Sequence, residues 1–319
     1  FQVALDDFTD IGPKTFAVAA LKVDYMKIDI ALITHTDADH IGSMSDLIKK
    51  YNVQLFVESG ITSGTKIYDS IEDLIRSKSI PQIQLMRGMK IVLDTSTEHV
   101  ESVDTAEKRP SVVFEVLFPS FLYQLDKYDT CMNAGQTSTA QNIRKKNFRV
   151  CKKYLKLETN ENSIVGRLVF GSTTFMLTGD APIEVEKYLV NQSVDFNNLF
   201  NKSRSTTIPV FAARSSFNTP LKSNVLKLGH HGSRTSTSDI FLEYVQPEFV
   251  VISSGLKNRY GHPHQEVLER LEKYFALTAP TAHSTLTVIS PNNPVLRTDT
   301  QGTITFQSDG SNLVLTTGH

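Results

Sequence analysis

The chain has 319 residues, of which 40% are apolar and 21% charged, and its formal net charge is −1. This composition is typical of a globular protein with a substantial core, and the charge excludes a globally basic nucleic-acid binder while permitting a local basic patch. Only two cysteines occur, Cys131 and Cys151, which excludes a disulfide scaffold and a cysteine zinc finger.

Short apolar runs alternate with helical patterns in the amino-terminal half, which predicts an α/β fold. The clearest strand is the apolar run IDIALIT at 28–34, which ends abruptly in polar residues. We expect further strands at 54–57, 90–93 and 112–119, and helices at 41–51 and 68–77.

From residue 163 onward the pattern predicts a hairpin of strands 163–170 and 174–178, joined at Gly171 and Ser172. We expect further strands at 225–228, 249–253, 285–290, 302–307 and 312–316, and helices at 183–190, 238–244 and 265–274. Residues 120–160 and 191–220 are polar and poorly periodic, and are predicted to be irregular insertions in a single domain spanning 1–319.

No apolar run reaches the length of about 18 residues that a membrane-spanning helix needs. The amino-terminal residues also lack the pattern of a secretory leader. The sequence therefore predicts no transmembrane segment, and we expect a cytoplasmic protein.

Six of the nine histidines fall in three clusters, each following a predicted strand or lying close downstream of one. The first cluster, His35-Thr-Asp-Ala-Asp-His40, places four metal-competent side chains in six residues. His35 and Asp37 could serve one metal ion, and Asp39 and His40 another. The alternative is a polar turn in which Asp39 caps the following helix, but that alternative does not explain the density of ligands.

The second group comes from Asp180 and the pair His230 and His231. Asp180 directly follows an apolar strand, so its carboxylate could project from a sheet edge and bridge two metals, although a lone Asp there would be a turn residue. Adjacent histidines cannot easily face one metal, so we expect one to be a ligand and the other to contact either substrate phosphate or a residue that orients a ligand. The sequence leaves open which, with His231 favoured because Gly232 permits close backbone approach.

The third cluster, His262 and His264, flanks Pro263 before a predicted helix, where backbone N–H groups favour anions. These histidines are candidates for holding a phosphate or protonating a leaving oxygen. The alternative is two surface histidines at a helix start.

These motifs resemble the metallo-β-lactamase superfamily. THTDADH is similar to its HxHxDH signature, with Asp37 where most members have His, and that form resembles the soluble hydrolase domain of ComEC-type competence DNA-internalisation proteins. The stretches LVFGSTTFMLTGD, LKLGHHGSRTSTS and VVISSGLKNRYGHPHQEVLERL agree with that family in the same order, so the resemblance runs from about residue 25 to 307.

The resemblance implies an αββα sandwich, in which two mixed β-sheets pack face to face with helices outside. It also implies two divalent metal ions per chain, with Asp180 in the position of the bridging carboxylate. The implied metal ligands are His35, Asp37, Asp39, His40, Asp180, His230 and His231; the implied catalytic residues are Asp39, His40, His262 and His264; Asn258 and Ser233 are expected to bind substrate.

One further histidine ligand of the superfamily has no counterpart here, since the corresponding region is Glu161-Asn162-Ser163. With Asp37 also replacing a histidine, the first metal would have mainly oxygen ligands. Such a site suits harder ions, so we expect Mn²⁺ in preference to Zn²⁺.

Seven basic residues lie between positions 144 and 156, with Phe148 and Tyr154 among them. They are Arg144, Lys145, Lys146, Arg149, Lys152, Lys153 and Lys156. Basic groups attract phosphates and aromatic rings stack on unpaired bases, so this segment favours nucleic acid as the partner, with Lys145, Lys146, Arg149, Lys152 and Lys153 as substrate-binding candidates. An ordinary solvated helix face is the alternative.

The leading hypothesis is a metal-dependent phosphodiesterase that acts as a nuclease on DNA or RNA through a two-metal-activated water. The alternatives are a small-molecule hydrolase of the same fold, such as a phosphocholine-type esterase or lactonase, and a non-catalytic metal-binding module.

Overall fold

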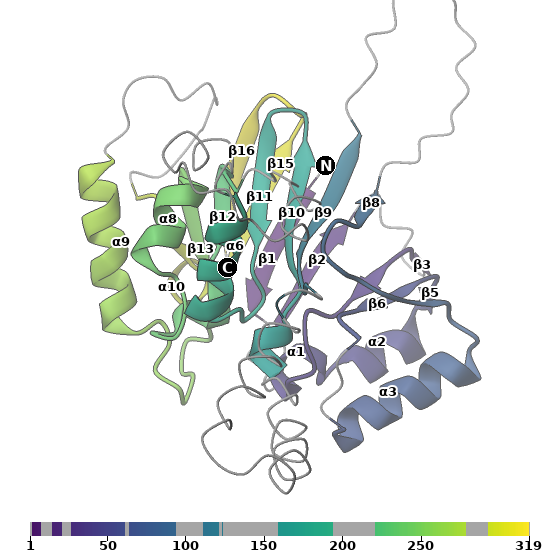
Figure 1. Cartoon of the computed structure of the whole chain (residues 1–319). Helices are drawn as coiled ribbons and strands as arrows, with labels where there is room; N and C mark the ends of the chain where they lie inside the picture. Colours follow the sequence, from purple (N-terminus) through teal and green to yellow (C-terminus); the bar gives the residue numbers. More distant parts are fainter. Residues whose placement is uncertain are drawn as a thin grey trace, which may run out of the picture.

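The computed structural model of the protein describes residues 27–60, 64–93, 111–120, 123, 159–193, 221–278 and 293–318, together with strands β1 (Gln2–Asp7) and β2 (Thr15–Ala20). Strands occupy the centre of the molecule and helices lie outside them (Figure 1). Within these described ranges, no helix combines the length and the apolar character that crossing a membrane requires.

The largest sheet has seven strands in the order β14-β13-β12-β11-β10-β9-β8. They are β8 (Lys90–Val92), β9 (Val112–Phe118), β10 (Val165–Phe170), β11 (Thr173–Leu177), β12 (Val225–Lys227), β13 (Phe249–Ile252) and β14 (Val295–Arg297). Strands β8 to β11 pair antiparallel, whereas β11 to β14 pair parallel. The carboxyl ends of the parallel strands meet at one edge, where ligand sites of α/β sheets form.

Smaller sheets form a second layer. One is an antiparallel sheet in the order β16 (Leu313–Gly318), β15 (Thr303–Ser308), β1 and β2. Another is a parallel sheet of β4 (Ala31–Leu32), β6 (Phe56–Glu58) and β7 (Gln82–Gln84). The third is the pair β3 (Lys27–Ile28) and β5 (Asn52–Val53). A buried cluster joins the two layers, and in it the rings of Phe175 and Phe306 meet edge to face at 5.8 Å. Alternating burial along β15 directs Ile304 and Phe306 into this core.

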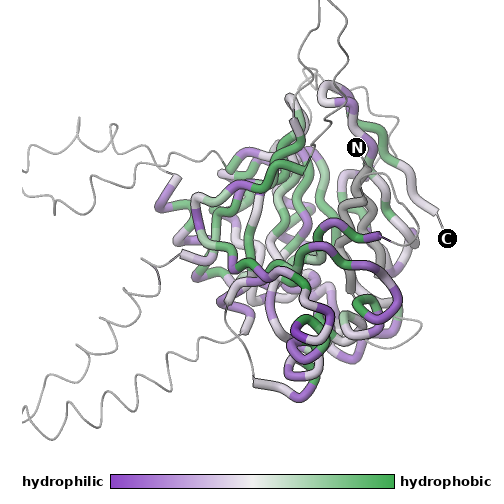
Figure 2. Tube along the Cα trace, turned by 90° about the vertical axis from the view of Figure 1, so that its right-hand side faces the viewer, coloured by the Kyte–Doolittle hydropathy of each residue, from purple (hydrophilic) through white to green (hydrophobic). Residues whose placement is uncertain are grey.

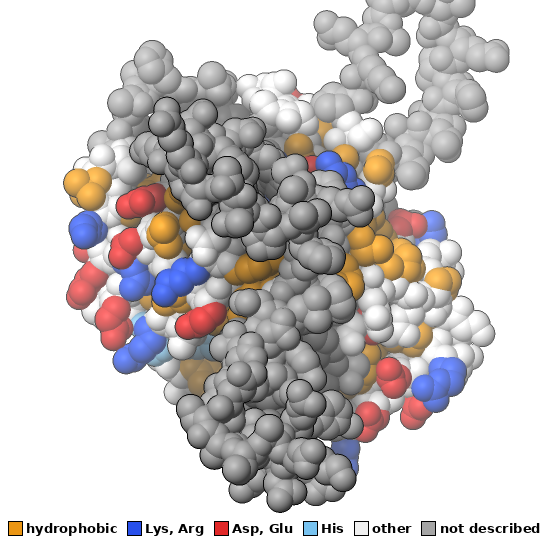
Figure 3. All heavy atoms as spheres, in the orientation of Figure 1, with side chains coloured by type: hydrophobic (Ala, Val, Ile, Leu, Met, Phe, Trp, Pro, Cys, Tyr) orange, Lys and Arg blue, Asp and Glu red, His pale blue; other side chains and the backbone are white. Residues whose placement is uncertain are grey.

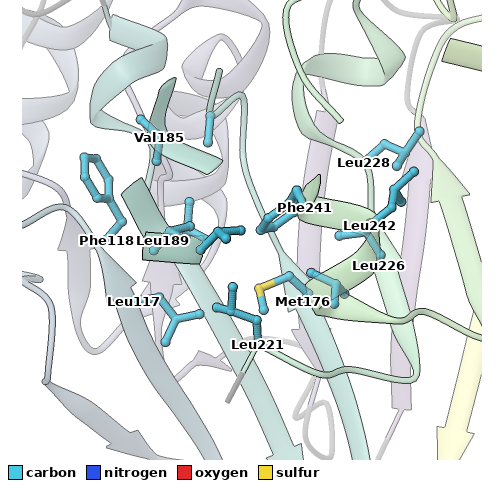
Figure 4. Packing of buried hydrophobic residues seen from close by; sticks show 14 of the residues in the cluster. Leu117, Phe118, Met176, Val185, Leu189, Leu221, Leu226, Leu228, Phe241 and Leu242 are labelled. Carbon is cyan, nitrogen blue, oxygen red and sulfur yellow. The ribbon is translucent and has the colours of Figure 1, made fainter. Parts of the chain in front are cut away.

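Three helices cover the outer face of the seven-stranded sheet: α6 (Ile183–Ser193), α8 (Asp239–Val245) and α9 (Gln265–Leu277). Figure 4 shows Val185 and Leu189 of α6 and Phe241 of α8 packed with Met176 and Leu226 of the sheet. In Figure 2 hydrophobic stretches of the chain are concentrated toward the interior, and hydrophilic stretches lie toward the outside.

Helices α1 (Ala38–Ile41), α2 (Met44–Lys50) and α3 (Lys66–Ser77) cover the second layer. In α3, Tyr68, Ile71 and Ile75 recur at helical spacing and are buried, which turns one face of the helix toward β4 and β6. Thr65 caps this helix by accepting a hydrogen bond from the Tyr68 backbone N–H. The remaining short elements are the 3₁₀ helices η1 (Thr159–Asn162) and η3 (Gly229–Gly232), and helix α10 (Thr298–Gln301).

The layers therefore follow the order helix, sheet, sheet, helix, and the predicted α/β sandwich is confirmed. In the described residues, the strands of the second layer form one antiparallel sheet and two separate parallel sheets. The predicted strand at 28–34 is interrupted: β3 ends at Ile28, and β4 covers only Ala31 and Leu32. The predicted helix at 41–51 instead begins at Ala38 and is broken between α1 and α2.

Candidate metal centre

The first histidine cluster spans the turn after β4 and the start of α1, with Asp39 and His40 inside the helix. Ile33 and Ile41 are buried on either side of it, which fixes both ends of the turn in the core. Asp37 occupies the position before α1 without capping it through its side chain, and Asp39 lies in the first turn. Burial of apolar residues, rather than helix capping, therefore holds the four candidate ligands in place.

His35 is buried and presents one ring nitrogen to the site. Its Nδ1 lies 3.0 Å from Thr34 Oγ1 and 3.3 Å from Ser163 Oγ, so Nε2 faces the opposite way. Nε2 is 3.8 Å from Asp180 Oδ2 and 3.7 Å from Asp37 Oδ2. Burial, reinforced by the charge of His40, lowers the pKa of His35 to about 3, so the ring is neutral and Nε2 can offer a lone pair.

Asp180 lies at the centre of the cluster, directly beyond β11. Its backbone N–H donates to Ser163 Oγ at 3.0 Å, which orients the residue. Its Oδ2 is 3.2 Å from His40 Nε2, and its Oδ1 is 3.6 Å from His231 Nε2. Burial would raise the pKa of Asp180, but the charges of His40 and His231 hold it well below its usual range.

His230 and His231 follow β12 in a turn with φ of 48° and 55°, and Gly232 continues it at φ 79°. With this backbone conformation, the rings of both histidines approach the Asp180 carboxylate. His231 Nε2 lies 3.3 Å from His40 Nε2 and 3.5 Å from Asp39 Oδ2. His230 is farther from the centre, with its Nε2 3.9 Å from Asp180 Oδ2 and its Nδ1 3.0 Å from Thr235 Oγ1.

The electrostatics of the pair differ. Burial alone would lower the pKa of His231, but the Asp180 carboxylate and the hydrogen bond with Asp39 raise it. For His230, burial is the larger influence, and it lowers the pKa despite the charge of Asp180. For the carboxyl of Asp39, burial alone would raise the pKa, but hydrogen bonding to His231 and the charge of His40 lower it to about 2.

The donor atoms of this cluster fit a divalent cation. One ligand atom from each of Asp39, His40, Asp180 and His231 lies within 4.8 Å of the other three. Among the described residues, His35 Nε2 and Asp180 Oδ1 are buried atoms without a hydrogen-bond partner. Buried polar atoms are rarely left unsatisfied, so these two atoms are suited to coordination. The mixed imidazole and carboxylate set suits ions such as zinc and manganese.

Asp37 is the most exposed member of the cluster, with 37% of its side chain accessible. Its Oδ1 accepts a hydrogen bond from the Thr159 hydroxyl of η1. Its Oδ2 lies 3.7 Å from His35 Nε2, so these two side chains are neighbours, as a first centre that includes both would require. Its role as a ligand stays a prediction.

The third histidine cluster lies at the rim of the site. The ring of His262 is 5.4 Å from that of His230 and 6.3 Å from that of His231. His264 lies 4.8 Å beyond it, and its Nδ1 accepts a hydrogen bond from the Arg234 backbone N–H. Burial, and then the charges of the neighbouring histidines, lower the pKa of His262 to about 4. The catalytic roles of both histidines stay predictions.

The two remaining candidates in the described residues contact protein groups. The Asn258 amide donates to the backbone oxygens of Gly255 and His262, at 2.9 and 2.6 Å, so it organises its own loop. Ser233 is buried, and its Oγ accepts from the Thr235 hydroxyl at 3.0 Å. Their contact with substrate stays a prediction. The five basic candidates, Lys145, Lys146, Arg149, Lys152 and Lys153, lie outside the described residues.

Sequence reasoning missed the residues that orient the ligands. Thr34 and Ser163 hydrogen-bond to His35, and the Ser253 backbone oxygen accepts from His231 Nδ1 at 2.7 Å. Ser163 belongs to the segment that aligns with the absent histidine of the family, which was the available signal. The Ser253 contact uses a backbone atom, which side-chain identity does not report.

No family model matches the chain, but its sequence is similar to several bacterial proteins, among them two whose names refer to competence and recombination. The chain is 26% identical over 285 residues to ComE operon protein 3 of Bacillus subtilis, covering 88% of this chain and 25% of that protein. It is 34% identical over 118 residues to competence protein ComA of Neisseria gonorrhoeae, covering 37% of this chain and 14% of that protein. It is 30% identical over 199 residues to recombination protein 2 of Haemophilus influenzae, covering 61% of this chain and 21% of that protein.

Among solved structures, the metallo hydrolase Igni18 of the archaeon Ignicoccus hospitalis aligns with a TM-score of 0.45 and 12% identity, over 97% of this chain and all of that one. The chain spans about a quarter or less of the length of the curated relatives that it matches. The relatives agree with the resemblance that the motifs carry. The chain thus resembles the ComEC-type competence proteins in sequence.

Proposed function

We propose that this chain is a metal-dependent phosphodiesterase that acts as a nuclease on DNA. The observation that carries the proposal is the position of Asp180, whose Oδ2 lies within 4 Å of Nε2 of His35, His40 and His230, while its Oδ1 lies 3.6 Å from His231 Nε2. One buried carboxylate facing two sets of ligands is suited to bridging two cations. The first set would be His35, Asp37 and Asp180, and the second Asp39, His40, His231 and Asp180.

Each residue has a distinct part in this proposal. Divalent cations at such a site neutralise charge on a phosphate and lower the pKa of water. The protein supplies the orientation: Thr34 and Ser163 fix His35, and the Ser253 oxygen fixes His231. His262 stands at the entrance, close enough to His230 to contact a phosphate oxygen beside the cluster.

DNA is favoured as substrate by two observations. The names of the matched relatives refer to competence and recombination, and recombination is a reaction of DNA. The basic segment at 144–156 provides cations that would follow a phosphate backbone. The nearly neutral net charge makes such a local cationic patch the main source of attraction.

A nuclease assay tests the proposal. We expect the wild-type chain to cleave a labelled single-stranded DNA with Mn²⁺, and the double variant Asp39→Asn, His40→Ala to be inactive. Asp46→Asn is the matched control, because Asp46 is an exposed residue of α2 paired with Lys49 at 3.9 Å. Wild-type protein that takes up Mn²⁺ but cleaves no phosphodiester would leave a metal-binding module as the function.

The basic segment distinguishes a nuclease from a small-molecule hydrolase. Reversing the charge of Lys145, Lys146, Lys152 and Lys153 to Glu should abolish polynucleotide cleavage while turnover of bis-p-nitrophenyl phosphate continues. Equal turnover of DNA by the reversed and wild-type chains would contradict a role for the segment. Cleavage of the small diester alone by wild-type protein would favour the small-molecule hydrolase.

A further inference from the structure

The loop between β13 and α9, residues 253–264, carries an exposed aromatic ring beside the candidate metal centre. Tyr260 is 60% exposed, whereas Ser253 and Ser254 at the start of the same loop are buried. Tyr260 belongs to none of the hydrophobic clusters in the described ranges. Large exposed aromatic rings are suited to binding, since they offer apolar area without contributing to the core.

The loop is held in one shape by its own hydrogen bonds. The Asn258 amide donates to Gly255 and His262 oxygens, and the His262 N–H donates back to Asn258 Oδ1 at 2.8 Å. The His264 N–H also donates to the Gly232 oxygen at 3.0 Å, which ties the loop to the turn carrying His231. The position of Tyr260 is therefore fixed relative to the metal ligands.

Three rings lead from the surface to the candidate metal centre. Tyr260 and His262 are stacked at 21° with centroids 5.8 Å apart, and His262 and His231 are stacked at 13° with centroids 6.3 Å apart. Tyr260 is thus the outermost ring of a nearly parallel series that ends at a candidate ligand. Figure 3 shows histidine side chains reaching the surface at the lower left, beside hydrophobic and Lys or Arg side chains.

A cation accompanies the outer ring. The Arg259 guanidinium lies 5.0 Å from the Tyr260 ring centroid and donates to the Tyr260 hydroxyl at 2.9 Å. These two contacts hold the Arg259 guanidinium next to the Tyr260 side chain. An aromatic face with an adjacent cation is the combination by which proteins bind an unpaired base and its phosphate.

We propose that Tyr260 is a stacking platform for an unpaired base of the substrate strand, and that Arg259 neutralises a phosphate beside that base. This inference rests on the proposed nuclease function and specifies a single-stranded nucleic acid as its substrate. Successive phosphates of one stacked strand are about 3.4 Å apart along its axis. The centroid distances from Tyr260 to His262 (5.8 Å) and from His262 to His231 (6.3 Å) together cover a few such spacings. The base stacked on Tyr260 would therefore lie a few nucleotides from the bond that is cut.

Binding measurements separate stacking from charge. The probes are a fluorescein-labelled thymidine oligonucleotide and an oligonucleotide of equal length whose sugars carry no bases, measured by anisotropy in EDTA so that neither is cleaved. We expect Tyr260→Ala to raise the Kd for the thymidine strand about 10-fold and to leave the Kd for the base-free strand unchanged. Tyr260→Phe, which keeps the ring, should bind both strands as the wild type does.

Arg259 has a different expected signature. Arg259→Gln should weaken both strands alike and reduce the slope of log Kd against log salt by about one. The control for both positions is Tyr244→Ala, since Tyr244 is a partly exposed tyrosine of α8, 38% accessible. It should leave both dissociation constants unchanged.

The absence of tryptophan from the sequence allows a direct optical test. Tyr260→Trp introduces a single tryptophan at the proposed platform, and Tyr244→Trp introduces one at the control position. We expect the thymidine strand to quench the emission at position 260 and the base-free strand to leave it unchanged. Neither strand should quench the tryptophan at position 244.

The outcomes distinguish this inference from the proposed function. If the wild type cleaves DNA but Tyr260→Ala weakens both strands equally or neither, the stacking platform is wrong and the nuclease stands. If Tyr260→Trp is quenched equally by both strands, the same conclusion follows. If the wild type neither binds nor cleaves DNA, both proposals fall.

Discussion

The imidazole of His231 donates its Nδ1–H to the backbone oxygen of Ser253 at 2.7 Å. A carbonyl oxygen can only accept, so Nδ1 carries a proton and the neutral ring has its lone pair on Nε2. That nitrogen faces Asp39, His40 and Asp180. Contacts of this kind fix the tautomer of metal-binding histidines and increase their basicity. The residue that directly follows β13 therefore orients His231 as a candidate metal ligand.

The shared position of Asp180 predicts how metal stoichiometry responds to substitution. Asp180→Asn should remove both Mn²⁺ ions, lowering affinity more than about 100-fold, because both ligand sets include this carboxylate. His231→Ala should remove one ion and retain the one held by His35, Asp37 and Asp180. Isothermal titration with Mn²⁺ measures both numbers. A single ion per wild-type chain would contradict the bridging role.

Ser163 predicts a combined loss of stability and metal affinity. Its Oγ accepts from the Asp180 N–H and lies 3.3 Å from His35 Nδ1, and the residue is fully buried. Ser163→Ala leaves that N–H unsatisfied, so the free energy of unfolding should fall by about 1–3 kcal/mol. Mn²⁺ affinity should fall about 10- to 100-fold, because the ligands lose their orientation.

Urea denaturation and metal titration check these two effects of Ser163→Ala. Ser77→Ala is the control, since Ser77 lies at the exposed end of α3 and its Oγ donates to Leu74. A Ser163→Ala chain with wild-type affinity would show that His35 and Asp180 hold their positions without it.

Gly232 and Gly261 form a matched pair for backbone strain. Both have positive φ, at 79° and 70°, but a Cβ on Gly232 would lie 2.8 Å from Pro263 Cβ, whereas one on Gly261 would meet nothing within 4 Å. Gly261→Ala should cost about 1–2 kcal/mol, the strain of a left-handed residue. Gly232→Ala should cost more and also weaken metal binding, because the clash displaces the turn that carries His231. Thermal unfolding of the two variants gives the comparison, and equal losses would contradict the clash.

Glu186 predicts a pH-dependent contribution to stability. Burial raises the pKa of this carboxyl above its ordinary value of 4.5, despite backbone hydrogen bonds from Ser238 and Thr237 and the charge of Arg270. A raised folded pKa means that the folded state binds the proton more tightly. The stabilising contribution is therefore complete below pH 4.5 and is lost as pH rises through the folded pKa.

We expect the free energy of unfolding of wild type, minus that of Glu186→Gln, to decrease as pH rises above 4.5. The decrease should be about 1.4 kcal/mol for each unit by which the pKa is raised. Urea denaturation across this range measures it, with Glu184→Gln on the exposed side of α6 as control. A difference that is constant with pH would show that the carboxyl titrates alike in both states.

The parts of the fold that sequence predicts well have long apolar runs or clear turns. The hairpin β10–β11 was predicted because apolar strands flank Gly171 and Ser172, and its register pairs Phe170 with Thr173. Strand β7 was missed because Gln82, Ile83 and Gln84 are all exposed and offer no apolar pattern. Strand β14 was missed because its pairing with β13, rather than its three residues, defines it.

The residues of the candidate site also divide into those that the sequence indicates and those that it does not. The candidate ligands His35, His40 and His231 could be picked out because their motifs are dense in metal-competent groups, whereas Asp180 was singled out by its place after a strand and by the family resemblance. Ser163 was not assigned a role, since a serine acquires one only through partners that lie far away in the chain, here 128 residues from His35. Tyr260 likewise has no signal in its own residue type and gains one from its exposure and its stacked neighbour.

Asp180 and His231 belong to the seven-stranded layer, whereas His40 belongs to the layer of β4 and β6, and 191 residues separate His40 from His231. During synthesis the segment that carries β4, α1 and His40 therefore leaves the ribosome long before its candidate coordination partners Asp180 and His231 exist. A cation taken up early could be held only loosely, by carboxylate and imidazole groups of one turn. Tight retention has to wait until the second half has folded against the first, so an incompletely synthesised chain would lack the proposed hydrolytic activity.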